Sequence, residues 1–507
     1  MLKKACAFLT VCVVLVSVFT FIPLQKAKAA TVVSRVVVSP EGKGYLEVDG
    51  KPYLDMHIQN VGRFNLAAMG PPNPLSFEEN YYEKTAQVNI KTASVIFPWS
   101  NIEPANQGEY DWTIIDKYVD WANQYGLRLD LAWFGTNGTG GAYLNGYKNG
   151  TTVPAYVQDQ GKYWGVGLTT NSNYAPWLPD GGPHDADAQF LFQAERNAVT
   201  ALFNHLASYD VNHRVIFFQL NNEPSVNPSW QNGQRGLWLD LLNQLGGAVK
   251  NSDYVVATRI NLAGGNVDDA DIVPLSNVDA IGYDPYDIQP SKTAQIISTT
   301  NSKYRYIAEN SGGYGNTTTL ALTALLNGGF YDIWQIADTE GYPLGIYKDA
   351  SEGQVNDYRN WVLGNSYALK YDLDSTKRLY GVLNKISTII APAPTNKMVG
   401  YNTDTFVPDD NYAQTKSVNG KDFAFSTTSK AVGLIVNKDN DYYALSDADN
   451  GTTNYFSTWQ QPVSVSVGYI DDNGSWVNEA NISPIDNGNG TWGILYYPGS
   501  VLRIELP

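Results

Sequence analysis

The stretch VIFFQLNNEP, residues 215–224, places Glu223 directly after a run of apolar residues. A second stretch, YIAENSGG at residues 306–313, repeats the same order with Glu309. Burying a carboxylate in an apolar strand costs free energy unless partners satisfy it, so each glutamate is either held by neighbours or retained for chemistry. Two such glutamates, on separate strands, are placed to flank one scissile bond.

Strand-like and helix-like segments alternate on both sides of this stretch. Helical spacing of apolar residues predicts helices near residues 113–122, 191–206, 236–249 and 319–326, and a closing helix near 379–390. Eight segments read as strands: 54–58, 88–97, 127–131, 215–218, 255–260, 280–283, 304–309 and 331–334. Eight βα units in one chain predict an α/β protein with a (β/α)8 TIM barrel.

The pattern changes at the Ala391-Pro392-Ala393-Pro394 segment. Beyond it, alternating apolar residues and Asn-Gly turns predict an antiparallel β-sandwich. The predicted organisation is therefore a signal peptide at 1–29, a catalytic barrel with an N-terminal β-hairpin at 30–394, and a C-terminal β-sandwich domain at 395–507. The sandwich is either an ancillary structural domain or a carbohydrate-binding module, and the absence of a single aromatic face in the sequence favours the first.

The first 29 residues carry Lys3 and Lys4, an apolar run from 5 to 24, and the small-residue site Ala27-Lys28-Ala29. This order is typical of a cleaved secretory signal, so we expect a secreted, extracellular protein that does not associate with membrane after cleavage. The alternative is an uncleaved anchor, because the run approaches the roughly 20 residues that span a bilayer. Both cysteines lie in this segment, so the mature chain would have neither disulfides nor cysteine-ligated metal.

The charge of the chain excludes one class of partner. Removal of residues 1–29 deletes four lysines and no acidic residue, so the formal charge of −16 becomes −20. Phosphate binding needs basic clusters, and none is present, so we expect no nucleic-acid partner. The four histidines are scattered along the sequence, and we expect no metal site and no cofactor. His57 is interpreted as a hydrogen-bonded residue at a strand end.

In a barrel of this type the active site lies at the carboxyl ends of the strands. Glu223 follows the fourth predicted strand and Glu309 ends the seventh. Two carboxyl groups about 5 Å apart at such a position are the arrangement of retaining glycoside hydrolysis. One carboxyl group must be protonated and the other ionised, and the charge of the second raises the pKa of the first.

Three motifs, taken in order, resemble clan A glycoside hydrolases and are most similar to families 42 and 35, the β-galactosidase-type families. They are FPWSNIEP at 97–104 with GEYDW at 108–112, then Asn222-Glu223-Pro224 after a strand, then Glu309 after a later strand. The similarity covers roughly residues 45–339. Where family 35 enzymes commonly carry Glu-Asn-Glu, this chain has Asn221-Asn222-Glu223, which departs from the galactose-specific pattern.

The resemblance implies roles for individual residues. Glu223 would be the acid/base, Glu309 the nucleophile and Asn222 a hydrogen-bond donor to the sugar 2-hydroxyl. Three aromatic residues would line the pocket: Trp99, Tyr283 and Trp334. Tyr283 would also orient Glu309. Alternatively, Trp99 and Trp334 pack at the barrel mouth without contacting substrate. Glu103 is interpreted as a residue that holds the second βα loop.

The leading interpretation is a secreted retaining β-glycosidase, β-galactosidase-like, acting on poly- or oligosaccharides. A second is an endo-β-glucanase or related endo-glycanase, in which the loop at 135–187 forms one wall of an open cleft. A third, from another class, is a non-catalytic carbohydrate-binding surface protein. The sugar, the linkage and the oligomeric state stay open at this stage.

Overall fold

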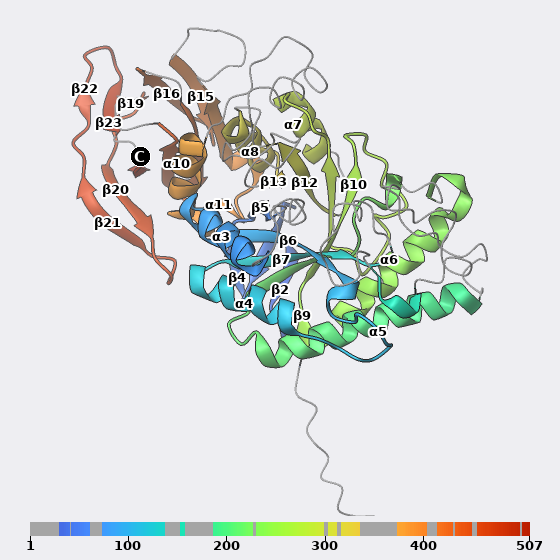
Figure 1. Cartoon of the computed structure of the whole chain (residues 1–507). Coiled ribbons are helices and arrows are strands. Elements are labelled where there is room, and N and C mark those ends of the chain that lie inside the picture. The colour runs from blue at the N-terminus through green and yellow to red at the C-terminus, as the bar shows by residue number, and fades with distance from the viewer. Residues whose placement is uncertain are drawn as a thin grey trace, which may run out of the picture.

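Eight of the described strands close into a parallel barrel, shown in Figure 1. The computed structural model describes residues 30–40, 42–60, 74–136, 153–157, 186–226, 230–298, 303–311, 316–334, 373–402, 413–428, 431–448, 454–496 and 499–507. The barrel confirms the fold class expected from the sequence. Its strands, in order around the barrel, are β5 (Met56–Asn60), β6 (Thr92–Pro98), β7 (Arg128–Phe134), β8 (Val215–Gln219), β10 (Ala257–Ala263), β11 (Ala280–Asp284), β12 (Tyr304–Ser311) and β13 (Phe330–Trp334).

Helices cover the outside of the barrel. In α4 the apolar side chains of Ile115, Tyr118, Val119 and Ala122 are buried, at the spacing the sequence suggests. Gly126, with φ of 67°, ends this helix in the left-handed conformation that glycine adopts without steric cost. The described helices are α3 (Pro74–Gln87), α4 (Thr113–Tyr125), α5 (Ala186–Tyr209), α6 (Arg235–Lys250), α7 (Pro290–Ser298), α8 (Thr317–Leu326), α10 (Leu373–Asn384) and α11 (Ser387–Ile390), with short turns η2 (Trp99–Asn101), η4 (Ala155–Val157), η5 (Pro224–Val226), η6 (Trp230–Gln234) and η10 (Thr395–Lys397).

A small N-terminal sheet lies at the amino ends of the barrel strands. It consists of β2 (Ser34–Val38), β3 (Gly44–Val48) and β4 (Lys51–Tyr53), while β1 (Thr31–Val32) pairs with β9 (Tyr254–Val255). The turn between β3 and β4 is Asp49-Gly50, both with positive φ, as the expected hairpin requires. The Ser34 hydroxyl donates to the carbonyl of Ile216 and accepts from the N–H of Ala257 at 2.9 Å. These bonds fix the sheet to β8 and β10, away from the end that carries the active site.

The C-terminal region is a sandwich of two antiparallel sheets beside the barrel (Figure 1). On β17, Leu434 and Val436 belong to the same apolar core as the barrel, whereas Ile435 between them belongs to the core of the sandwich. One face of the six-stranded sheet therefore packs toward the barrel, where α8 contacts β14 and β17 and α10 contacts β18. The six-stranded sheet has the order β14 (Met398–Asn402), β17 (Val432–Lys438), β18 (Asp441–Ser446), β24 (Val501–Glu505), β20 (Ser464–Ile470) and β21 (Trp476–Asn481), and the five-stranded sheet β15 (Ala413–Val418), β16 (Lys421–Thr427), β19 (Asn454–Thr458), β23 (Trp492–Tyr496) and β22 (Ile485–Asp486).

Two sequence expectations lie outside the described residues. They are the signal segment at 1–29 and most of the long loop at 135–187. In the part of the chain that the structure describes, none of the helices has the length and apolar character needed to cross a membrane.

Candidate active site

Glu223 lies four residues beyond the end of β8, in the turn that leads into η5. Its φ of 42° is in the left-handed region, which a residue with a side chain adopts at a cost on the order of 1–3 kcal/mol and which is concentrated at functional sites. The backbone N–H of Glu223 donates to Oδ1 of Asn261, on β10, at 3.1 Å. The neighbouring strand therefore holds the chain in this conformation and fixes where the Glu223 side chain begins.

Glu309 reaches the site because β12 contains a bulge. Tyr306 faces the barrel interior, where its hydroxyl donates to the carbonyl of Ile260 at 3.1 Å. Side chains alternate along a regular strand, so a residue three positions further on would face the helices instead. The pairing with β13 shifts between Ile307 and Asn310, which adds one residue to β12. The bulge restores Glu309 to the interior side, in the way that bulges re-aim side chains next to active sites.

Tyr286 and Gln59 donate to the Glu309 carboxylate, and Asn261 lies beside it. The Tyr286 hydroxyl donates to its Oε2 at 2.5 Å, and Nδ2 of Asn261 lies 3.4 Å from its Oε1. Burial raises the pKa of Glu309 to about 8, the charge of Glu223 adds to this, and the bond from Tyr286 acts in the opposite direction. Because donors stabilise the ionised form of a carboxyl group, these contacts suit a carboxylate that must be charged to attack.

Asn261, at the end of β10, connects the site residues. Its Nδ2 donates to Oδ1 of Asn222 at 3.0 Å and to Oδ2 of Asp284 at 2.8 Å, while its Oδ1 accepts from the backbone of Glu223. Asn261 is fully buried. One side chain thus sets the positions of three residues that come from two other barrel segments.

Asp284, the last residue of β11, adds a third carboxyl group. It is 1% exposed and is hydrogen-bonded to Glu223. Burial raises the pKa of Asp284 well above its usual value, and the charges of Glu309 and Glu223 raise it further. Burial also raises the pKa of Glu223. Two carboxyl groups in hydrogen-bond contact favour a proton between them, because the negative charge of each raises the pKa of the other.

Asn222 and Trp334 lie at the site, as the resemblance implies. The Asn222 amide oxygen accepts from Gln219 at 3.1 Å as well as from Asn261, so the orientation of its amide is fixed. The partly exposed Trp334 ends β13, and its ring meets the Tyr286 ring edge-on at 5.5 Å. Trp334 therefore borders the residue that holds Glu309.

Tyr283 is not brought to Glu309. Within β11 it alternates with Asp284 and lies on the outer face, where its ring is 5.7 Å from the Arg305 guanidinium and its hydroxyl accepts from Arg305 at 3.3 Å. Arg305 is in turn paired with Asp269 at 2.6 Å. The residue that contacts Glu309 is Tyr286, three positions later.

Trp99 is fully buried beneath the second βα loop. Its indole N–H donates to Glu103 at 2.7 Å, and its ring meets Tyr156 edge-on at 6.3 Å. Glu103 also accepts from the Tyr156 hydroxyl at 3.0 Å and from the N–H of Gly108. The structure thus gives Glu103 the loop-holding contacts expected for it and places Trp99 among them, rather than on an open wall.

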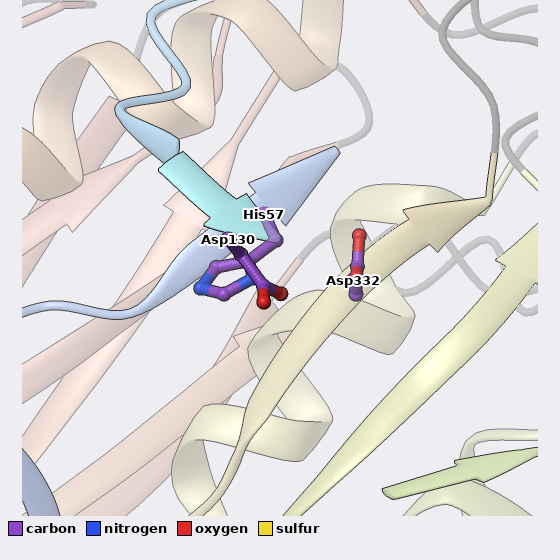
Figure 2. A group of neighbouring side chains, drawn as sticks. All are labelled: His57, Asp130 and Asp332. Atoms are coloured by element: carbon purple, nitrogen blue, oxygen red, sulfur yellow. The ribbon is translucent and has the colours of Figure 1, made fainter. Parts of the chain in front are cut away.

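Below the site, charged side chains from several strands meet inside the barrel. Figure 2 shows His57, Asp130 and Asp332, each from a different strand. The Arg259 guanidinium contacts Asp130 and lies 3.5 Å from Asp332, and the His57 ring contacts Asp55 and Asp130. All are buried.

The charges of this interior cluster stabilise one another. Although burial alone would lower the pKa of His57, the charge of Asp55 and the bond to Asp130 raise it to about 9. Burial raises the pKa of Asp332 to about 7, and Arg259 opposes that rise.

One nitrogen and two oxygens of the interior cluster lie within 4.8 Å of one another, close enough to consider a metal. Oδ2 of Asp130 already contacts the Arg259 guanidinium, and the raised pKa of His57, about 9, favours its charged form. A metal ion would therefore meet two positive groups. This arrangement is that of an internal ion-pair network, in which Arg259 occupies the place of a cation.

Comparisons with known proteins bear on this site. A family profile described as Beta-galactosidase, glycoside hydrolase family 42, matches residues 76–141, which run from α3 to just beyond β7. The match covers one part of the barrel, and there the chain is similar to this family. A second profile, a domain of unknown function (DUF4978), matches residues 238–357, the part that contains Asp284, Tyr286 and Glu309. No curated protein matches the chain.

Solved structures with remote similarity cover most of the chain. One, described only as a glycoside hydrolase, has 10% identity and a TM-score of 0.45 over 93% of this chain and 96% of its own. An exo-β-1,4-mannosidase from Opitutaceae bacterium strain TAV5 has 12% identity and a TM-score of 0.44 over 71% of this chain and 63% of its own. Endo-glycoceramidase II from Rhodococcus sp. has 12% identity and a TM-score of 0.42 over 93% and 100%.

Proposed function

We propose that the protein is a secreted retaining β-glycoside hydrolase in which Glu309 is the nucleophile and Glu223 the acid/base. The observation that carries the proposal is the difference between the surroundings of the two carboxyl groups. Glu309 accepts hydrogen bonds from Tyr286 and Gln59, which favour its ionised form. Burial raises the pKa of Glu223, the hydrogen bond with Asp284 opposes that rise, and Glu223 in turn raises the pKa of Asp284, so the pair favours one bound proton. A retaining glycosidase needs one carboxyl group in each state.

The two residues would act in two displacements. In the first, the Glu309 carboxylate attacks the anomeric carbon while Glu223 protonates the departing glycosidic oxygen. In the second, Glu223, now ionised, takes a proton from a water molecule that displaces Glu309 from the sugar. The amide of Asn222, next in sequence to Glu223, would donate to the sugar 2-hydroxyl, and the two bonds to its oxygen support this by fixing its orientation.

For the substrate we propose a β-galactoside within a poly- or oligosaccharide. The support is the match of residues 76–141 to the β-galactosidase profile, together with the FPWSNIEP motif at 97–104. Secretion is proposed from the sequence of residues 1–29, whose order of charged, apolar and small residues is that of a signal peptide.

The proposal is tested by the release of nitrophenol from β-linked aryl galactoside, glucoside, mannoside, xyloside and fucoside, alongside reducing-end release from β-glucan, galactan and mannan. We expect cleavage of the galactoside by the wild-type chain and loss of that cleavage in Glu309→Gln. In Glu223→Ala, azide is expected to restore turnover of an aryl substrate as the β-glycosyl azide, because a small anion then replaces the water that Glu223 activates.

The other outcomes favour the alternative functions. Activity on polymers alone would favour an endo-β-glucanase or related endo-glycanase. If all the substrates remain intact while the protein binds them, the chain would be a non-catalytic carbohydrate-binding protein. Unchanged turnover in Glu223→Gln on a substrate with a poor leaving group would contradict the assignment of the acid.

A further inference from the structure

Three carboxyl groups from three segments of the barrel converge at the proposed catalytic centre. Glu223 follows β8, Asp284 ends β11 and Glu309 lies in the bulge of β12. The proposed double displacement uses two of them. Asp284 is buried and hydrogen-bonded to Glu223, so it cannot be regarded as a solvated surface acid.

We propose that Asp284 is a positioning residue that shares one proton with Glu223. The shared proton keeps the acid/base protonated until the glycosidic oxygen takes that proton. Asp284 would act through Glu223 and would not touch the sugar. The proposal rests on the role given to Glu223 above.

The position of Asp284 supports this role. Nδ2 of Asn261 donates to its Oδ2 at 2.8 Å and to Oδ1 of Asn222 at 3.0 Å, so the amide that holds Asn222 also holds Asp284. The same Asn261 anchors the backbone of Glu223. A single neutral side chain thus holds both the Asp284 carboxyl group and the backbone of Glu223, and it has no charge to offset theirs.

The other groups that face Asp284 do not compensate its charge. From β12, Glu309 and Tyr306 act on it, and Tyr286 in the loop after β11 interacts with both Asp284 and Glu309. From β10 the facing residue is the neutral Asn261. Among the described residues, anions and neutral donors surround the Glu223–Asp284 pair. These surroundings favour a bound proton on the pair, because they disfavour two negative charges there.

A shared proton keeps the charge of the three carboxyl groups constant through the reaction. In the reactive form, above the pKa of about 8 to which burial raises Glu309, Glu309 carries one negative charge before attack, and the Glu223–Asp284 pair, with one proton, carries another. As the bond from Glu309 to the anomeric carbon forms, the glycosidic bond breaks and the leaving oxygen takes the proton of the pair. Glu309 is then a neutral ester and the pair carries both charges. When water attacks the anomeric carbon, its proton returns to the pair and Glu309 leaves as a carboxylate.

The decisive variant is Asp284→Asn, which keeps the shape of the side chain and its acceptor for Asn261. Its amide would donate to Glu223 and stabilise the ionised form, so the pKa of Glu223 is expected to fall. The basic limb of the kcat/KM profile should move to lower pH by about one unit or more. Cleavage of a substrate with an alkoxide leaving group should drop about tenfold at neutral pH, and cleavage of a dinitrophenyl glycoside, which needs no acid, should change by less than about threefold.

Asp269→Asn is the matched control, because it removes another buried aspartate that pairs with Arg305 on the outer face of the barrel. A merely structural loss would lower the cleavage rates of both substrate classes equally and leave the basic limb of the kcat/KM profile in place. That result in Asp284→Asn would overturn the proposal.

A second readout needs no turnover. Infrared spectra of protein with 13C-labelled aspartate and glutamate carboxyl groups resolve protonated from ionised acids. One shared proton predicts that Asp284→Asn and Glu223→Gln each remove one protonated-acid band at neutral pH, and that the double variant removes that same single band. Loss of two bands in the double variant, or of none in Asp284→Asn, would contradict sharing.

The two readouts separate the two claims. If the wild-type chain cleaves no glycoside, the proposed function fails while the infrared result still decides whether the pair shares a proton. If Asp284→Asn does not fold, Glu223→Gln with labelled aspartate decides, because the aspartate band must disappear in it.

Discussion

Replacing Tyr286 by phenylalanine removes one hydroxyl group from the proposed catalytic centre. That hydroxyl donates to Oε2 of Glu309 at 2.5 Å, and it lowers the pKa of a carboxyl group that burial raises to about 8. A hydrogen bond to a charged group contributes about 1.5–3 kcal/mol, and one pKa unit corresponds to about 1.4 kcal/mol. Tyr286→Phe removes this donor to the ionised carboxylate and should therefore raise the pKa of Glu309 by about one to two further units.

The assay is the pH profile of kcat/KM on the best aryl glycoside, because this parameter follows the free enzyme. The acid limb should move to higher pH by the same one to two units, and activity below the limb should fall by about 10- to 100-fold. Tyr283→Phe is the matched control, since its hydroxyl contacts Arg305 on the outer face of the barrel. An acid limb that stays in place in Tyr286→Phe, or that moves equally in Tyr283→Phe, would refute the reasoning.

Three further predictions concern stability. The pKa of Glu309 is 4.5 in the unfolded chain and about 8 in the folded protein, so its burial lowers the free energy of unfolding as the pH rises through that interval, by at most about 5 kcal/mol. Glu309→Gln should therefore unfold at a higher temperature than wild type at pH 8, with no advantage at pH 4. Arg259→Leu removes the guanidinium shared by Asp130 and Asp332 and leaves His57 as the cation beside Asp130, so it should cost about 3–5 kcal/mol in urea unfolding. Gly282→Ala places a methyl group 2.2 Å from the Tyr306 ring and should lower the free energy of unfolding by about 1–3 kcal/mol. An unchanged urea midpoint in Arg259→Leu or in Gly282→Ala would contradict the packing described.

The two glutamates could be found from the sequence because each follows an apolar strand. The same signal occurs a third time, in Asp284 after Ala280-Ile281-Gly282-Tyr283, and it marks the third carboxyl group of the site. The strand count around the barrel followed from βα alternation, so the fourth and seventh positions were available without coordinates. This part of the site is encoded locally.

Other features depend on which face of a strand a residue occupies. Tyr283 was expected beside Glu309, but it adjoins the inward-facing Asp284 in a regular strand, so alternation alone directs it outward. Glu309 faces inward only because of the bulge in β12, which arises from pairing with β13 and has no clear mark in the sequence.

Long-range contacts account for what remained hidden. Asn261 is an ordinary polar residue at a strand end until its partners on two neighbouring segments are known. Charged residues inside apolar strands, such as Asp130 and Arg259, indicate an interior network, but only the closed barrel shows which of them meet.

The central claim is that Glu309 forms a covalent bond to the sugar. An activated 2-deoxy-2-fluoro glycoside of the sugar that the aryl panel selects slows the second displacement and allows the intermediate to accumulate. Mass spectrometry of the intact protein should show one added glycosyl group, and peptide mapping should place it on Glu309, with no addition in Glu309→Gln. Turnover of the parent glycoside without any adduct, or an adduct on Glu223 or Asp284, would contradict the account.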